Sequence, residues 1–262
     1  MGFSYKEWVG PFYAPGTAAN QMLGRYSTAF DTVELDTTFY APPRAAFADK
    51  WRNETPDGFT FAAKVWQRIT HELRFRDVQE DLALYLNAVD RLRPKLGPLL
   101  FQCPPDLTVD ALPEFSALVA ALPAGYRWAV EFRHRSWFIP EVRDLLTEAN
   151  VALAGVDHND LPRYLTPTAD FLYVRLLGNR SRITSIGKVV KDRAEDVQRW
   201  AAEIQEALPS VDDAWVLVNN HYSGFSPHTV ALLYEALGLA PPRFPAEAPP
   251  DLGPLFRSAG AG

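Results

Sequence analysis

Short apolar runs of strand length alternate along the chain with longer segments of helical periodicity. The runs are nearly continuous in Val, Leu, Ala and aromatic residues, which is typical of parallel strands covered on both faces. They span residues 32–36, 59–65, 98–103, 127–132, 151–156, 171–177 and 214–219. Between them apolar residues recur every three or four positions, as at Val78, Leu82 and Tyr85. This alternation predicts β/α units with a parallel sheet.

The pattern favours an α/β fold of the TIM-like (β/α) barrel type, in which eight parallel strands close on themselves. A chain of 262 residues fits one such domain, which we expect to span residues 1–239. The seven runs leave one strand missing, and its place would be before Gly2. We therefore expect either a first strand lost by N-terminal truncation or another segment that completes the sheet. Residues 240–262 are rich in proline and predict an extended or disordered tail.

Composition narrows the class of protein. The net charge is −6, so the basic excess that broad nucleic-acid binding needs is absent, and only a local basic patch would serve. Cys103 is the single cysteine, which excludes an intramolecular disulfide, and its apolar surroundings favour a buried thiol. No apolar run has the length of a signal peptide or of a membrane span. We expect a soluble, cytoplasmic protein without a membrane partner.

Polar side chains follow most of the predicted strands. The carboxyl ends of parallel strands gather at one end of a barrel, so we expect these side chains to line one pocket. In chain order they are Glu34 and Asp36, Lys64, Gln102, Glu131, Arg133 and His134, Asp157, Arg175, and Asn219, Asn220 and His221. Tyr5, Tyr40 and Trp137 add aromatic rings near the mouth of this pocket, where they either stack a ligand or simply pack.

Acid–base chemistry is one use of such a pocket. Glu34 and Asp36 are two residues apart in a strand, so both carboxylates face one way and could take different protonation states. The candidate catalytic residues are Glu34, Asp36, Lys64, Glu131 and His134. Glu34 or Asp36 would be the base, and Glu131 or His134 would be the acid. The alternative is structural: Glu34 pairs with Lys64 on the next strand, and Glu131 pairs with an arginine, without catalysis.

The cations of the pocket favour an anionic ligand. Arg133 and Arg175 would hold a phosphate or carboxylate by paired hydrogen bonds, with Lys64 beside them. Gln102, Asn219 and Asn220 would orient the substrate. The alternative is that these cations only neutralise the neighbouring acids.

Metals and cofactors find little support in the sequence. His134, His158 and His221 all follow strands, but their spacing forms no metal-binding motif, and we predict no metal site. The chain lacks a glycine-rich phosphate loop, a dinucleotide fingerprint and a Gly-x-Ser-x-Gly motif, so the sequence identifies no cofactor.

An ordered set of motifs resembles the DUF72 (YecE-like) family, a domain of unknown function. The motifs are Gly-Phe-Ser-Tyr-Lys-x-Trp from residue 2, Val-Glu-Leu-Asp-Thr-Thr-Phe-Tyr from residue 33, Glu-Phe-Arg-His-x-Ser-Trp from residue 131 and Asn-Asn-His from residue 219. The likeness covers about residues 2–238 and implies a TIM-like barrel with its motifs at one end. It implies no reaction.

The chain departs from the family pattern at several positions. Phe3 stands where the pattern has Trp, and Asp36 stands where it has Asn, which adds a negative charge. Members also carry a strand ahead of the first motif.

Three hypotheses for function follow. The first is an enzyme that acts on a small anionic or sugar-like substrate. The second is a metal-dependent nucleic-acid-processing barrel similar to endonuclease IV, and the third is a barrel that binds or regulates without turnover. The sequence leaves open whether the protein is an enzyme, which substrate it takes and whether it forms oligomers.

Overall fold

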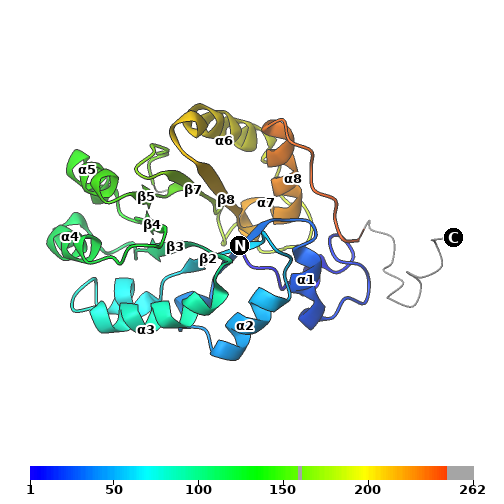
Figure 1. Cartoon of the computed structure of the whole chain (residues 1–262). Helices are drawn as coiled ribbons and strands as arrows, with labels where there is room; N and C mark the ends of the chain where they lie inside the picture. The colour runs from blue at the N-terminus through cyan, green and yellow to red at the C-terminus, as the bar shows by residue number, and fades with distance from the viewer. Residues whose placement is uncertain (159–160, 247–262) are drawn as a thin grey trace.

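The computed structural model describes residues 1–158 and 161–246, and it is an α/β structure in which every paired strand runs parallel to its neighbour (Figure 1). One sheet has the order β1-β2-β3-β4-β5 and the other β6-β7-β8. The strands are β1 (Thr32–Leu35), β2 (Thr60–Lys64), β3 (Leu96–Gln102), β4 (Trp128–Glu131), β5 (Val151–Leu153), β6 (Gly155–Asp157), β7 (Phe171–Leu176) and β8 (Asp213–Val218). The predicted α/β class with parallel strands is confirmed.

Helices follow most of the strands and lie around their outside (Figure 1). The α-helices are α1 (Met22–Tyr26), α2 (Ala45–Asn53), α3 (Gln79–Val89), α4 (Leu112–Ala120), α5 (Pro140–Glu148), α6 (Ala194–Ala207), α7 (Asn220–Ser223) and α8 (Ser226–Ala236). Short 3₁₀ turns span Lys6–Trp8, Ala19–Gln21, Thr37–Phe39, Asp90–Leu92, Val109–Ala111, Arg135–Trp137 and Leu208–Ser210, and Arg68–Glu72 forms a π-helical turn.

The run at residues 151–156, expected as one strand, is two strands. β5 pairs with β4, β6 pairs with β7, and Ala154 separates them. Ala154 still donates its N–H to the carbonyl of Val130 at 2.9 Å, so the chain bends from one sheet into the other without leaving the layer of strands. The expectation of a single strand was wrong because the two halves of the run pair with different strands, β4 and β7, which belong to different sheets.

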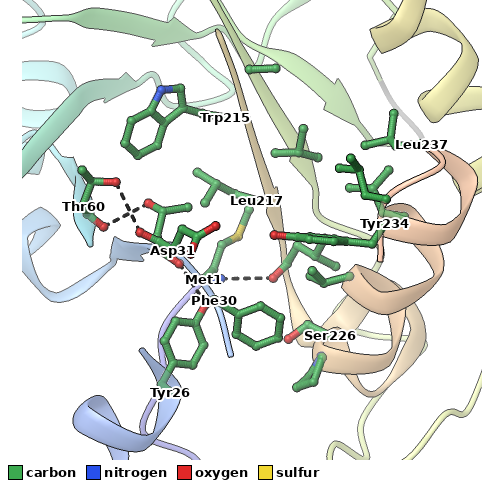
Figure 2. Close-up of a pocket in the computed structure, with 18 of the residues that line it drawn as sticks. Met1, Tyr26, Phe30, Asp31, Thr60, Trp215, Leu217, Ser226, Tyr234 and Leu237 are labelled. Atoms are coloured by element: carbon green, nitrogen blue, oxygen red, sulfur yellow. Dashed lines mark hydrogen bonds between the residues drawn. The ribbon is translucent and has the colours of Figure 1, made fainter. Parts of the chain in front are cut away.

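The described strands do not form a closed barrel. β1 pairs only with β2, and β8 pairs only with β7, which leaves one edge of each strand unpaired. The N-terminal residues lie between these two edges. Met1 N donates to Val218 O at 3.1 Å (Figure 2). Gly2 N donates to Glu34 O, also at 3.1 Å.

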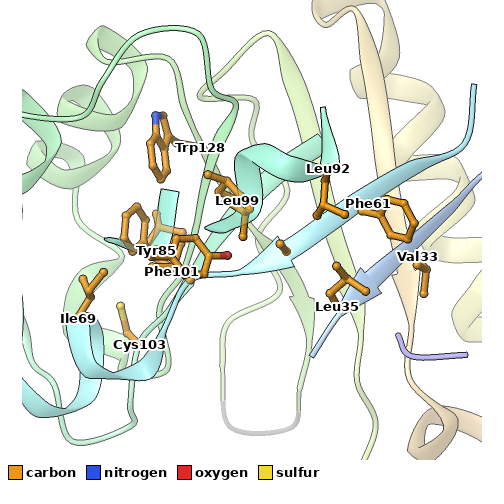
Figure 3. Packing of buried hydrophobic residues seen from close by; sticks show 14 of the residues in the cluster. Val33, Leu35, Phe61, Ile69, Tyr85, Leu92, Leu99, Phe101, Cys103 and Trp128 are labelled. Atoms are coloured by element: carbon orange, nitrogen blue, oxygen red, sulfur yellow. The ribbon is translucent and has the colours of Figure 1, made fainter. Parts of the chain in front are cut away.

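Side chains alternate between the two faces of each strand, as the geometry of a strand requires. On the outer face, Val33, Leu35 and Phe61 pack with helix residues in a large cluster (Figure 3). The inner faces of both sheets share a second cluster that includes Ala62, Leu100, Ala129, Ala152, Tyr173 and Leu217. Near the carboxyl ends of the strands, the inward-facing residues are charged. Glu34, for example, faces inward between Val33 and Leu35, which face outward.

Two smaller expectations, on Cys103 and on the C-terminal tail, can be compared with the structure. Cys103 is fully buried, and this burial raises the pKa of its thiol well above the usual value. In the segment expected to begin the tail, two residues contact the core: Ala246 N donates to Phe12 O at 2.8 Å, and the Phe244 ring lies 5.3 Å from the Phe12 ring. The rest of the expected tail, residues 247–262, lies outside the described residues.

Within the described part of the chain, no helix has the length and apolar character needed to cross a membrane. The cytoplasmic location expected from the sequence stays a prediction.

The buried side chain of Lys95 binds backbone carbonyls at the C-terminal end of helix α2, and it gives a first testable prediction. The Lys95 ammonium donates to Arg52 O at 2.8 Å and to Thr55 O at 2.7 Å, and Lys95 is 8% exposed. We expect Lys95→Met to lower the free energy of unfolding in urea by about 1–3 kcal/mol, because these buried carbonyls lose their donor. The matched control is Lys50→Met, which removes an exposed ion pair with Glu54 and should cost less than ~1 kcal/mol. Equal losses in the two variants would contradict this role.

Candidate active site

A buried layer of charge lies at the carboxyl end of the inner cluster. Arg175 of β7 is 1% exposed, and its Nη2 donates to Glu34 Oε1 of β1 at 2.7 Å. Its Nη1 donates to Glu131 of β4. The Tyr173 hydroxyl donates to Glu34 Oε2 at 2.8 Å. Glu34 is therefore paired with Arg175 and not with Lys64, which corrects the structural pairing expected from the sequence.

Glu131 connects this buried network to Arg133, which lies nearer the surface. It also accepts a hydrogen bond from Nε of Arg133, so it lies between two guanidinium groups. Burial alone would raise the pKa of Glu131, but the charges of Arg175 and Arg133 outweigh it and lower that pKa to about 2. A carboxyl that is ionised at neutral pH suits the positioning of Arg133 better than the proton donation expected for it.

A polar pocket of about 640 Å³ opens above this layer. The predicted site residues that line it are Tyr5, Asp36, Tyr40, Lys64, Gln102, Arg133, Asn219, Asn220 and His221. They come from the N-terminal segment and from the ends of β1, β2, β3, β4 and β8. The structure thus brings together side chains that lie as far as 216 residues apart, because parallel strands end at the same edge of a sheet.

Asp36 and Lys64 form the ion pair of this pocket, with Lys64 Nζ 3.1 Å from Asp36 Oδ1. Burial alone would raise the pKa of Asp36. The charges of Lys64 and Arg175 and the N-terminal ammonium outweigh it, so the pKa of Asp36 lies below its usual value. Asp36 is therefore a carboxylate at neutral pH and can accept a proton.

Asn220 and His221 present further polar atoms to the pocket. The Asn220 side-chain oxygen accepts from Trp8 Nε1 at 3.3 Å and from the Ser226 hydroxyl at 3.0 Å, whereas its Nδ2 has no partner among the described residues although Asn220 is 2% exposed. His221 Nδ1 lies 2.8 Å from the carbonyl of Ile183. A carbonyl only accepts, so Nδ1 carries the proton and a neutral ring has its acceptor at Nε2.

Three further predicted residues lie outside the lining of this pocket. His134 Nδ1 is 2.8 Å from the Ser136 hydroxyl, next to its own backbone turn. Trp137 is buried, and its Nε1 donates to Leu107 O at 2.7 Å. Asp157 accepts from Trp200 and Tyr222 behind the strands. Hydrogen bonds and packing within the protein occupy these side chains, and the same holds for Glu34, Glu131 and Arg175.

The pocket also includes residues that were not among the predicted site residues. They are Phe39, His158, Leu177, Gly178, Asn179, Arg180, Ser181 and Ile186. Most belong to the loop after β7, and Gly178 there has the left-handed φ of +68°. The sequence carries a signal for some of them, since Gly178, Asn179 and Arg180 directly follow a predicted strand and therefore lie at its carboxyl end.

Across residues 1–158 and 161–246, the structure places no three His, Cys, Asp or Glu side chains where they could hold a metal ion together.

The parallel α/β fold and the polar pocket at its strand ends define the structural class of this protein, and comparisons with known proteins define its family. The family model described as "Protein of unknown function DUF72" matches residues 1–252. The chain therefore belongs to the DUF72 family, which confirms the resemblance seen in its motifs.

Curated relatives agree with this assignment. The chain is 28% identical to the UPF0759 protein YunF of Bacillus subtilis over 271 aligned positions, which cover 87% of this chain and 93% of the relative. It is 30% identical to the UPF0759 protein YecE of Escherichia coli K12 over 116 positions, which cover 44% of this chain and 43% of that protein.

Solved structures share the fold. A DUF72 family protein of Thermotoga maritima matches with a TM-score of 0.75 at 24% identity, over 90% of this chain and 96% of that one. A DUF72 family protein of Enterococcus faecalis matches with a TM-score of 0.70 at 19% identity, over 86% and 96%. At these identities the likeness shows the fold alone.

Proposed function

We propose that this protein is an enzyme that acts by acid–base chemistry on a small, sugar-like substrate carrying one anionic group. The observation that supports it most is the Asp36–Lys64 pair, a carboxylate held ionised beside an ammonium inside a pocket of about 640 Å³. Such a pair offers a proton acceptor and an electrostatic anchor within one ligand's reach.

The charge of the pocket supports a substrate with little negative charge. Each inner cation already has an acidic partner: Lys64 has Asp36, whereas Arg133 and Arg175 share Glu131, and Arg175 also holds Glu34. Arg180 adds a cation at the exposed rim. A ligand with one phosphate or carboxylate fits this balance, whereas a polyanion would face the acids as well.

The remaining lining groups suit hydroxyl-rich ligands. Gln102, Asn219 and Asn220 line the pocket, and their amide groups supply donors and acceptors for a ligand. Tyr40 is 69% exposed at the mouth, where its ring can cover the face of a sugar. These groups orient the substrate while Asp36 takes a proton and His221 Nε2 serves as the second proton-transfer site.

We also propose that the two sheets act as a TIM-like barrel frame for this chemistry. In such frames ligands bind at the carboxyl ends of the strands, which is where the pocket lies. The buried charged layer then positions a pocket residue, because Arg175 holds Glu131, and Glu131 in turn holds the guanidinium of Arg133.

A binding screen tests the substrate class and makes the second prediction. We expect thermal shift and calorimetry to find ligands among sugar phosphates and sugar acids. Lys64→Met should weaken a bound anionic ligand about 10–100-fold, because a charged hydrogen bond contributes roughly 1.5–3 kcal/mol. The exposed Lys50→Met variant should bind as the unchanged protein does. If no sugar acid or sugar phosphate binds, or if Lys64→Met binds as tightly, the proposed substrate class is wrong.

Turnover is tested separately. Incubation of bound ligands in D₂O, followed by NMR, detects exchange of a substrate proton. Asp36→Asn should retain binding and abolish this exchange or any product formed, because an amide cannot accept the proton. Exchange that persists in Asp36→Asn would remove Asp36 from the role of base.

A further inference from the structure

A second cavity, of about 460 Å³, lies between helix α1, helix α2 and the segment that contains Phe3. Figure 1 shows these two helices next to each other. The apolar residues that line the cavity are Phe3, Leu23, Pro42, Pro43, Phe47 and Trp51. We call this cavity the aromatic cleft. Its volume lies in the range of pockets that bind small organic molecules.

The aromatic cleft and the polar pocket lie on opposite sides of one stretch of chain. Asp36 and Tyr40 line the polar pocket, whereas Thr38, which lies between them in the sequence, lines the cleft. The Thr38 hydroxyl is 2.8 Å from Leu35 O and 2.8 Å from Lys64 O, and these contacts fix the shared wall. The cleft is therefore a separate site with a preformed wall.

Two aromatic rings form one side of the cleft. Phe47 and Trp51 are one turn apart on α2, and their rings stack at 25° with centroids 6.4 Å apart. Phe47 is 53% exposed, so the face that it shares with Trp51 is open to a ligand. Because the two rings are nearly parallel, a flat aromatic molecule can stack against both. Pro42 and Pro43 line the same cleft and have no N–H to offer a polar ligand.

Arg44 gives the rim of the cleft a positive charge. Across residues 1–158 and 161–246, the exposed Arg44 forms no ion pair. Lys50, which also lines the cleft, lies 3.6 Å from Glu54 and is neutralised by it. A guanidinium without an acidic partner beside an aromatic surface matches a carboxylate, which it holds by two parallel hydrogen bonds.

We propose that the aromatic cleft binds a flat aromatic carboxylate, with its ring against Phe47 and Trp51 and its carboxylate on Arg44. The two features define the ligand class together. An aliphatic acid would lose the stacking, and an aromatic amine would be repelled by the cation. This site does not depend on the function proposed for the polar pocket, so either proposal can fail without the other.

Calorimetry with three probes of similar size tests the ligand class. We expect naphthylacetate to bind with a Kd below about 1 mM. Naphthylethylamine reverses the charge and decanoate lacks the rings, so each should bind at least about 10-fold more weakly. In a proton–nitrogen NMR spectrum, naphthylacetate should shift the indole N–H signal of Trp51, which a Trp51→Phe protein identifies.

Two variants test the two halves of the contact. We expect Phe47→Ser to weaken naphthylacetate at least about 10-fold, because the ligand loses a stacking face. Arg44→Gln should weaken it about 3–10-fold, because a charged hydrogen bond at the rim is lost. Both residues are exposed, so the core stays packed in both variants. The exposed Leu84→Ser and Arg182→Gln proteins are the matched controls and should bind as the unchanged protein does.

Several results would overturn the proposal. The ligand class is wrong if naphthylacetate does not bind below about 1 mM, or if naphthylethylamine or decanoate binds as tightly. The site is wrong if Phe47→Ser binds as Leu84→Ser does, or if the Trp51 signal stays in place while naphthylacetate binds. Equal affinities in Arg44→Gln and Arg182→Gln would remove the carboxylate from Arg44.

Discussion

Arg175→Met should lower the free energy of unfolding by about 3–5 kcal/mol. Arg175 is 1% exposed and bonds to both Glu34 and Glu131, which are 0% exposed. Methionine fills a similar volume but leaves two carboxylates buried without a cation, and that desolvated charge accounts for the loss. Guanidinium unfolding curves for the variant and the unchanged protein measure the difference.

The matched control is Arg143→Met, which breaks an exposed pair with Asp144 and should cost less than ~1 kcal/mol. A loss for Arg175→Met no larger than this control would show that the buried layer contributes little to stability.

The pH dependence of stability gives the same network a second signature. In the unchanged protein the pKa of Glu131 is about 2, below the ordinary 4.5. Its contribution is fully present above pH 4.5 and is lost as the pH falls toward 2, because the unfolded state then binds more protons. In Arg175→Met the deficit should shrink over the same fall in pH, since protonation removes the uncompensated charges. A deficit that stays constant would point to lost packing instead.

Gly178→Ala should destabilise the protein by about 2–4 kcal/mol and impair ligand binding in the polar pocket at the strand ends. A Cβ on Gly178 would come within 2.1 Å of the backbone oxygen of His221 and 2.4 Å of Cα of Tyr222, and the residue has φ +68°. Backbone atoms cannot rotate away as a side chain does, so the loop after β7 or helix α7 must shift. Both elements line the pocket. Urea unfolding and calorimetry with the best ligand measure the two effects.

Gly125→Ala is the matched control, because Gly125 also has a left-handed φ of +83° but its added Cβ would meet nothing within 4 Å. It should cost about 1 kcal/mol from backbone strain alone, with ligand affinity unchanged. Equal effects at the two glycines would mean that the close approach to His221 is relieved without cost.

The sequence predicted the strands and the grouping of their polar ends because both follow from periodicity and from parallel topology. It could not predict which acid meets which cation. Glu34 and Arg175 belong to β1 and β7, strands in different sheets, and their contact depends on the curvature of the whole layer. Two-residue spacing placed Glu34 and Asp36 on one side correctly, yet one lies in the buried layer and the other in the pocket.

Loop residues escaped prediction for a different reason. Asn179 and Arg180 directly follow a predicted strand, but they have no periodic pattern, so the backbone path after β7 decides that they reach the pocket. The break at Ala154 escaped as well, because an apolar run does not record that its two halves have different partners.

Asn220 gives the pocket an optical reporter. Its side-chain oxygen accepts from the indole of Trp8, while its unpaired nitrogen belongs to a pocket-lining amide. A ligand that hydrogen-bonds to the Asn220 amide should alter the hydrogen bond that the Trp8 indole donates to it, and with it the fluorescence emission of that indole. Fluorescence, with a Trp8→Phe protein as the blank, thus follows ligand entry without a label.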